Sequence, residues 1–146
     1  MRIAVVAFGN NEDGCITYRL LTSLDADRLD SDVCLIEGGT DVLKTLETLT
    51  GFDGIVILDT ASSGEAVGAA RIIDYNEFLF STSPAPLSLH NIQSDHLFYA
   101  HKFLNIPRVL LVAIEVPPPG SSGKEVSIDI EKCSEIVRTA MSRLAT

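Results

Sequence analysis

Short runs of apolar residues alternate along the chain with longer segments in which apolar residues return every three or four positions. The short runs are rich in Val, Ile and Leu and are too short for helices, so they predict buried strands. The predicted strands are residues 2–8, 33–36, 54–58, 69–75 and 109–114. The helical spacing predicts helices at residues 14–24, 41–50, 92–104 and 128–144.

The order of these elements predicts an α/β fold, with helices on both faces of a mostly parallel five-stranded sheet. The connection from 54–58 to 69–75 is too short for a helical crossover, so the later strand is expected to pair antiparallel or to lie at an edge. Ser127 precedes the last helix and is its expected N-cap. With 146 residues the chain is long enough for one substantial core, and we expect a single domain spanning 1–146.

The charge balance disfavours some kinds of partner. The formal net charge is −9, whereas nonspecific nucleic-acid binding and attachment to anionic membranes both need clustered Lys and Arg. No apolar run approaches the roughly 18 residues of a membrane span, and the N-terminus shows no signal-peptide pattern, so we expect a cytoplasmic protein. The three cysteines, Cys15, Cys34 and Cys133, form no CxxC pair, and we expect reduced thiols.

Three polar residues suited to chemistry stand at the ends of predicted elements. Asp13 follows the first strand, Asp59 follows the third, and His90 lies at the predicted start of the third helix. Ligands of open α/β sheets bind outside the carboxyl ends of the strands, so these side chains are expected at one edge. Two carboxylates and an imidazole that leave coordination positions open are typical of a reactive or substrate-sharing metal site.

Each of these residues also has a purely structural interpretation. Asp13 suits a helix N-cap, Asp59 suits an Asx-turn at a strand end, and His90 suits a cap or an exposed position. If Asp59 serves only the chemistry, Asp59→Asn should change stability by no more than about 0.5 kcal/mol. The first loop is acidic and lacks GxGxxG, so it suits a cation better than a phosphate. GxSxG, HExxH and a Cys/His nucleophile signature are absent.

Four motifs, in this order and spacing, resemble those of the nickel–iron hydrogenase maturation endopeptidases. They are GN…EDG after the first strand, EGGT after the second, ILDT…G after the third and SLHN before a helix. The resemblance covers nearly the whole chain and implies a three-layer αβα fold. It implies an endopeptidase that removes the C-terminal extension of a hydrogenase large-subunit precursor. By the same resemblance, Asp13, Asp59 and His90 bind the nickel already inserted in that substrate, and residues 38–40 line the cleft.

The loop before the first helix is shorter than is usual in that family, so Glu12 is an alternative to Asp13 as a ligand. No cofactor of the protein's own is expected, because the nickel comes with the precursor. Three N/O donors without the substrate's thiolates should hold nickel weakly, so the purified site is expected to be empty or adventitiously filled. We expect a monomer or weak homo-oligomer without membrane insertion. The alternatives are a non-hydrolytic nickel-handling or large-subunit-binding maturation factor on the same fold, and a nucleotide- or flavin-binding module.

Overall fold

The computed structural model describes residues 1–9, 15–26, 30–74, 89–105, 108–118 and 128–146. The strands are β1 Ile3–Phe8, β2 Val33–Gly39, β3 Gly54–Ala61, β4 Ala70–Asp74 and β5 Val109–Glu115. The helices are α1 Ile16–Ala26, α2 Val42–Glu47, α4 Ser94–Phe103 and α5 Ile130–Leu144. The order of elements predicted from the sequence is therefore confirmed.

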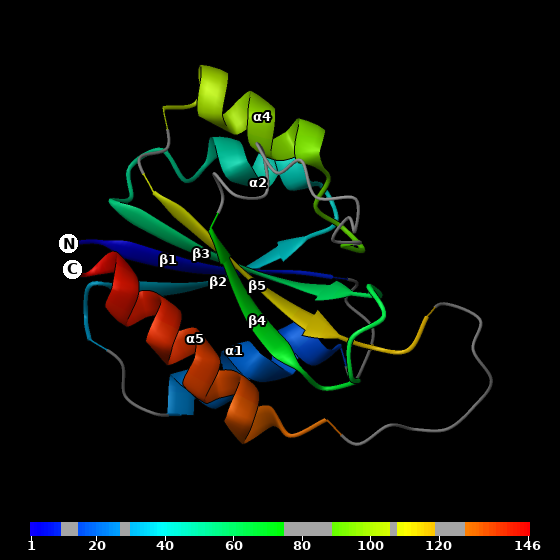
Figure 1. The fold of residues 1–146 in the computed structure, drawn as a ribbon. Coiled ribbons are helices and arrows are strands. Elements are labelled where there is room, and N and C mark those ends of the chain that lie inside the picture. The colour runs from blue at the N-terminus through cyan, green and yellow to red at the C-terminus, as the bar shows by residue number, and fades with distance from the viewer. Residues whose placement is uncertain (10–14, 27–29, 75–88, 106–107, 119–127) are drawn as a thin grey trace.

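The five strands form one sheet in the order β2-β1-β3-β5-β4. Neighbouring strands are parallel except for β4, which pairs antiparallel with β5 at the edge. Helices α2 and α4 cover one face of the sheet, and α1 and α5 cover the other (Figure 1). The predicted fold class is confirmed, including the single antiparallel strand. None of the helices in the described part of the chain is long and apolar enough to cross a membrane.

The three central strands carry the core, as their continuous apolar runs predict. All residues of β1 and β5 are buried, and along β3 the side chains alternate between two apolar clusters. Val56 and Leu58 pack on the side of α1 and α5, whereas Ile55 and Ile57 pack on the side of α2 and α4. This alternation follows from strand geometry and determines which face each later residue of β3 meets.

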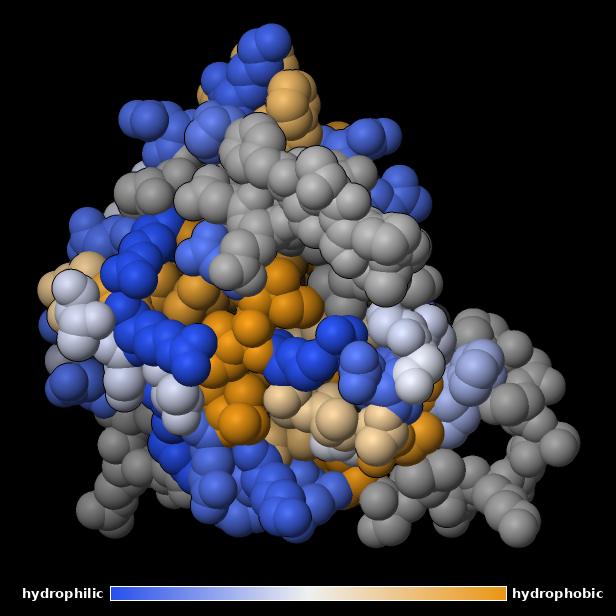
Figure 2. All heavy atoms as spheres, in the orientation of Figure 1, coloured by the Kyte–Doolittle hydropathy of each residue, from blue (hydrophilic) through white to orange (hydrophobic). Residues whose placement is uncertain are grey.

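Edge strand β4 is only half-buried along its length. It lies toward the viewer in Figure 1, and the space-filling view in the same orientation shows apolar side chains in the centre of this face, bordered by polar ones (Figure 2). Partial exposure is what an edge strand with one open side is expected to show.

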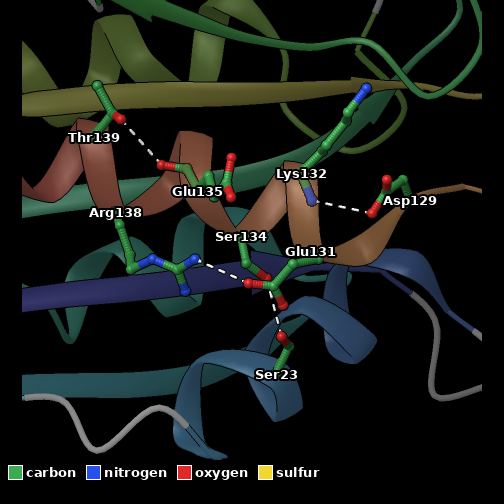
Figure 3. Close-up of polar contacts among 8 residues, drawn as sticks. All are labelled: Ser23, Asp129, Glu131, Lys132, Ser134, Glu135, Arg138 and Thr139. Carbon is green, nitrogen blue, oxygen red and sulfur yellow. Dashed lines mark hydrogen bonds and ion pairs between the residues drawn. The ribbon is translucent and has the colours of Figure 1, made fainter.

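Helix α5 begins later than its apolar spacing predicts. Its N-cap is Asp129, whose side chain accepts a hydrogen bond from the Lys132 backbone N–H at 3.2 Å. The predicted cap, Ser127, lies outside the described residues. The Ser134 hydroxyl donates to the Ser23 hydroxyl at 3.0 Å, which joins α5 to α1 (Figure 3). Close packing of these two helices is possible because both contact residues are small.

Two predicted boundaries near the candidate site are wrong. Strand β3 continues through Asp59 to Ala61, because these residues pair in register with Ala113 to Glu115 of β5. Helix α4 begins at Ser94 after the N-cap Gln93, so His90 lies before the helix and does not open it. Gln93 and His96 form the capping box that starts α4.

Candidate functional site

The segment that carries His90 lies against the carboxyl end of β3, although the two are 30 residues apart in sequence. Leu89 forms an antiparallel bridge with Ala61, and the His90 backbone N–H donates to the Thr60 carbonyl oxygen at 2.9 Å. These contacts bring Asp59 and His90 to one corner of the sheet, at the edge where their positions in the sequence place them.

The Asp59 carboxylate is buried, with 1% exposure, and accepts four hydrogen bonds. One oxygen, Oδ1, accepts from the Thr60 backbone N–H and from the Asn91 side-chain amide, each at 2.9 Å. The other, Oδ2, accepts from the backbone N–H groups of Asn91 at 2.9 Å and of Ile92 at 2.8 Å. Asp59 therefore fixes the segment that carries His90 onto the end of β3.

Burial raises the pKa of the Asp59 carboxyl above its ordinary value, and the four hydrogen bonds oppose that effect. A carboxylate has about four lone-pair sites. All four are used by N–H groups of this chain. An ion can bind Asp59 in this arrangement only by displacing one of these donors.

The His90 side chain is exposed, and both of its ring nitrogens are hydrogen-bonded to hydroxyl groups. Nδ1 lies 2.8 Å from Thr60 Oγ1, and Nε2 lies 2.9 Å from Ser62 Oγ. Ser62 Oγ donates its one proton to the Val116 carbonyl oxygen at 3.3 Å, so it accepts from Nε2. The ring is thereby held along one side of the β3 end.

Asp59 and Thr60, whose hydroxyl contacts the His90 ring, are neighbours in β3. Successive side chains of a strand project to opposite faces, so the Cβ atoms of these two residues point to opposite faces of the sheet. No hydrogen bond joins the Asp59 carboxylate to the His90 ring in the described structure. The third predicted ligand, Asp13, and its alternative Glu12 lie outside the described residues. Within the described ranges no three His, Cys, Asp or Glu side chains gather as a metal site would require, and the three-ligand site stays a prediction.

A second corner, at the ends of β1 and β2, is closed around Gly38 and Gly39. A Cβ atom at Gly38 would lie 2.8 Å from the Phe8 ring, and Gly39 has a φ of +68°, so both positions require glycine. The Tyr18 hydroxyl donates to the Gly9 carbonyl oxygen at 3.1 Å and accepts from the Gly39 N–H at 3.0 Å. Burial raises the pKa of this hydroxyl above its ordinary value.

Glu115 is a structural residue of the site that the sequence pattern does not reveal. It ends β5 and is buried, and its carboxylate accepts from the Ser63 N–H at 2.7 Å and from the Glu65 N–H at 2.9 Å. These bonds hold the loop that follows β3, in which Ser62 contacts His90. Because its partners are backbone groups some 50 residues away, only the folded chain identifies them.

Truncating Glu115 is expected to destabilise the protein. Glu115→Ala leaves two backbone N–H groups without their acceptor, so the free energy of unfolding should fall by about 2–4 kcal/mol. Glu115→Gln retains one carbonyl oxygen for both donors and should cost about 1 kcal/mol. Thermal unfolding followed by circular dichroism measures the difference. Equal melting temperatures for the two variants would contradict the assigned role.

This chain is similar in sequence and in fold to known proteins. The sequence profile of the hydrogenase maturation protease family matches residues 18–144. The hydrogenase maturating endopeptidase HybD of E. coli is similar in structure with a TM-score of 0.66 at 23% identity, over 98% of this chain and 93% of that one. The NiFe hydrogenase maturation protease HybD of Thermococcus kodakarensis has a TM-score of 0.66 at 19% identity, over 96% and 99% of the two chains.

HycI of Thermococcus kodakarensis, also a NiFe hydrogenase maturation protease, has a TM-score of 0.61 at 18% identity, over 98% of this chain and 91% of that one. Likeness at such low identity establishes the shared fold, while the profile match extends over most of the sequence. Among proteins of curated function, none matches this sequence.

Proposed function

The chain belongs to the hydrogenase maturation protease family, and we propose that it is an endopeptidase that removes the C-terminal extension of a nickel–iron hydrogenase large-subunit precursor after nickel insertion. The observation that carries the proposal is the corner at the end of β3, where a buried carboxylate and an exposed imidazole lie on adjoining segments inside the matched region. We further propose that the reaction takes place in the cytoplasm.

In this proposal Asp59, His90 and Asp13 bind the nickel that the precursor carries. Carboxylate oxygens and an imidazole nitrogen are suitable donors for a divalent first-row metal, and they leave positions for ligands of the substrate. The metal anchors the precursor, and as a Lewis acid it can polarise the scissile carbonyl. The chain's own residues orient the precursor on the carboxyl edge of the sheet, and no cofactor of the protein's own is required.

A cleavage assay tests the proposed activity. Purified protein is incubated with nickel-loaded precursor, and the loss of mass that corresponds to the C-terminal extension is followed by mass spectrometry. Cleavage supports an endopeptidase. Stable binding of the precursor without loss of mass would instead support the alternative, a non-hydrolytic maturation factor on the same fold. Nucleotides and flavins should leave the melting temperature unchanged, since a ligand that binds the native state raises it.

The choice between Glu12 and Asp13 is tested with a pair of matched variants. Asp13 directly precedes Gly14 and the predicted helix, where a short acidic side chain is favoured by the helix dipole. We therefore expect Asp13→Asn to abolish cleavage and Glu12→Gln to retain most of it. Initial cleavage rates on both variants, each checked for folding by circular dichroism, give the answer. Loss of activity only in Glu12→Gln would assign the ligand to Glu12.

A further inference from the structure

The structure points to a feature of the Asp59–His90 corner that the proposed function does not require. Every lone pair of the Asp59 carboxylate and of the His90 ring is already hydrogen-bonded to a group of this chain. The Asp59 carboxylate accepts four N–H groups, and the His90 ring contacts two hydroxyls. An ion that binds here must therefore displace at least one of these hydrogen bonds.

We propose that Asn91, Thr60 and Ser62 are positioning residues that cap these two ligands in the free protein. They hold Asp59 and His90 in a closed arrangement, which nickel presented by the precursor opens by displacing the caps. This inference rests on the proposed function, because it concerns how the same corner distinguishes substrate-borne nickel from free ions.

The cap on Asp59 is the Asn91 side chain. Of the four donors to the carboxylate, three are backbone N–H groups, which the packing of β3 and of the segment before α4 holds in place. The fourth is the Asn91 side-chain amide, 2.9 Å from Oδ1. A side-chain amide can turn away by rotation about its own bonds, whereas a backbone group cannot leave without moving the segment. The lone pair that Asn91 covers is therefore the one that an ion can take.

The caps on His90 are the two hydroxyls. Thr60 Oγ1 lies 2.8 Å from Nδ1, and Ser62 Oγ lies 2.9 Å from Nε2. Both ring nitrogens are thus engaged, so the ring has to release at least one hydroxyl before it can bind an ion. Ser62 is held in turn, because its hydroxyl donates to Val116 and the loop after it is bound to Glu115.

These caps lower the affinity of the free protein for metal without removing any ligand. Free Ni²⁺ must break the capping bonds with only its own bonds to Asp59 and His90 to compensate for them. Nickel held in the precursor arrives with thiolate ligands and with the rest of the protein–protein contact, whose binding free energy can offset the loss. The corner would thus select metal in the substrate over metal in solution.

The affinity of the free protein for Ni²⁺ alone, measured by isothermal titration calorimetry and chelator competition, tests this inference. Asn91→Ala removes the cap on Asp59 and keeps the Asn91 backbone donor, and Thr60→Val with Ser62→Ala removes both caps on His90. Each change should raise the affinity about tenfold, because the hydrogen bonds that hold Asp59 Oδ1 or the His90 ring in place no longer compete with the ion. Thr139→Val, which removes an exposed hydroxyl from α5, is the matched control and should leave the affinity unchanged.

A gain in affinity separates capping from a merely structural role, since damage to the site would weaken binding. Adding His90→Gln to the Thr60→Val, Ser62→Ala variant should abolish the gain. Unchanged or weaker affinity in both capping variants would overturn the inference. Because no precursor takes part in this measurement, such a result would leave the endopeptidase proposal standing, whereas failure of wild-type protein to cleave loaded precursor would refute that proposal alone.

Discussion

Asp59→Asn is expected to abolish precursor cleavage and also to lower the free energy of unfolding by about 1–3 kcal/mol. The carboxylate is 1% exposed, and each of its oxygens accepts two N–H groups. An asparagine presents one oxygen and one NH₂ group, so at least one donor of this chain faces another donor. For a chain of this size the melting temperature should fall by roughly 3–9 °C.

Thermal unfolding and cleavage of nickel-loaded precursor measure the two effects separately. Asp25→Asn, at an exposed position of α1, removes the same charge without a buried partner and serves as the control; it should stay within about 0.5 kcal/mol of wild type. An Asp59→Asn variant as stable as this control would show that the four hydrogen bonds contribute little. A variant that folds and cleaves normally would remove Asp59 from the proposed site.

The sequence alone supports a much smaller effect of Asp59→Asn on stability, and the difference lies in tertiary structure. As the first polar residue after an apolar run, Asp59 looks like the beginning of an exposed loop. In the fold, β5 continues far enough to pair with Asp59, Thr60 and Ala61, so the strand extends and the carboxylate becomes buried. Two of its partners are the backbone N–H groups of residues 91 and 92, which cannot be predicted from a pattern of side chains.

The overall architecture, by contrast, follows from local patterns. Uninterrupted runs such as GIVIL and VLLVAI are typical of parallel strands buried between two layers of helices, and the short connection before β4 predicts the antiparallel pairing or edge position, both of which are observed. The same reasoning brings Asp59 and His90 to one edge. It does not predict the hydrogen bonds of the His90 ring, because the partner hydroxyls of Thr60 and Ser62 come into contact with the ring only in the folded chain.

The other large effect concerns the metal in the substrate. Nickel-loaded precursor is expected to be cleaved on the order of a hundredfold faster than nickel-free precursor. Without the nickel anchor the scissile bond is misplaced, and a misplacement of about 1 Å costs that much in rate. Initial rates are compared by mass spectrometry with one preparation of precursor, before and after loading with nickel. Restoration of the rate on loading excludes damage to the precursor as the cause.

The structure gives a reason to expect this dependence to be steep. Asp59 and His90 are each hydrogen-bonded to groups of their own chain, so a precursor without nickel has nothing with which to displace those bonds. Free Ni²⁺ added to the enzyme before nickel-free precursor should not substitute, since the ion would lack the substrate's thiolates. Equal rates for loaded and unloaded precursor would refute nickel-gated recognition. The Asp59–His90 corner would then have a structural role at the edge of the sheet and would not bind the nickel of the precursor.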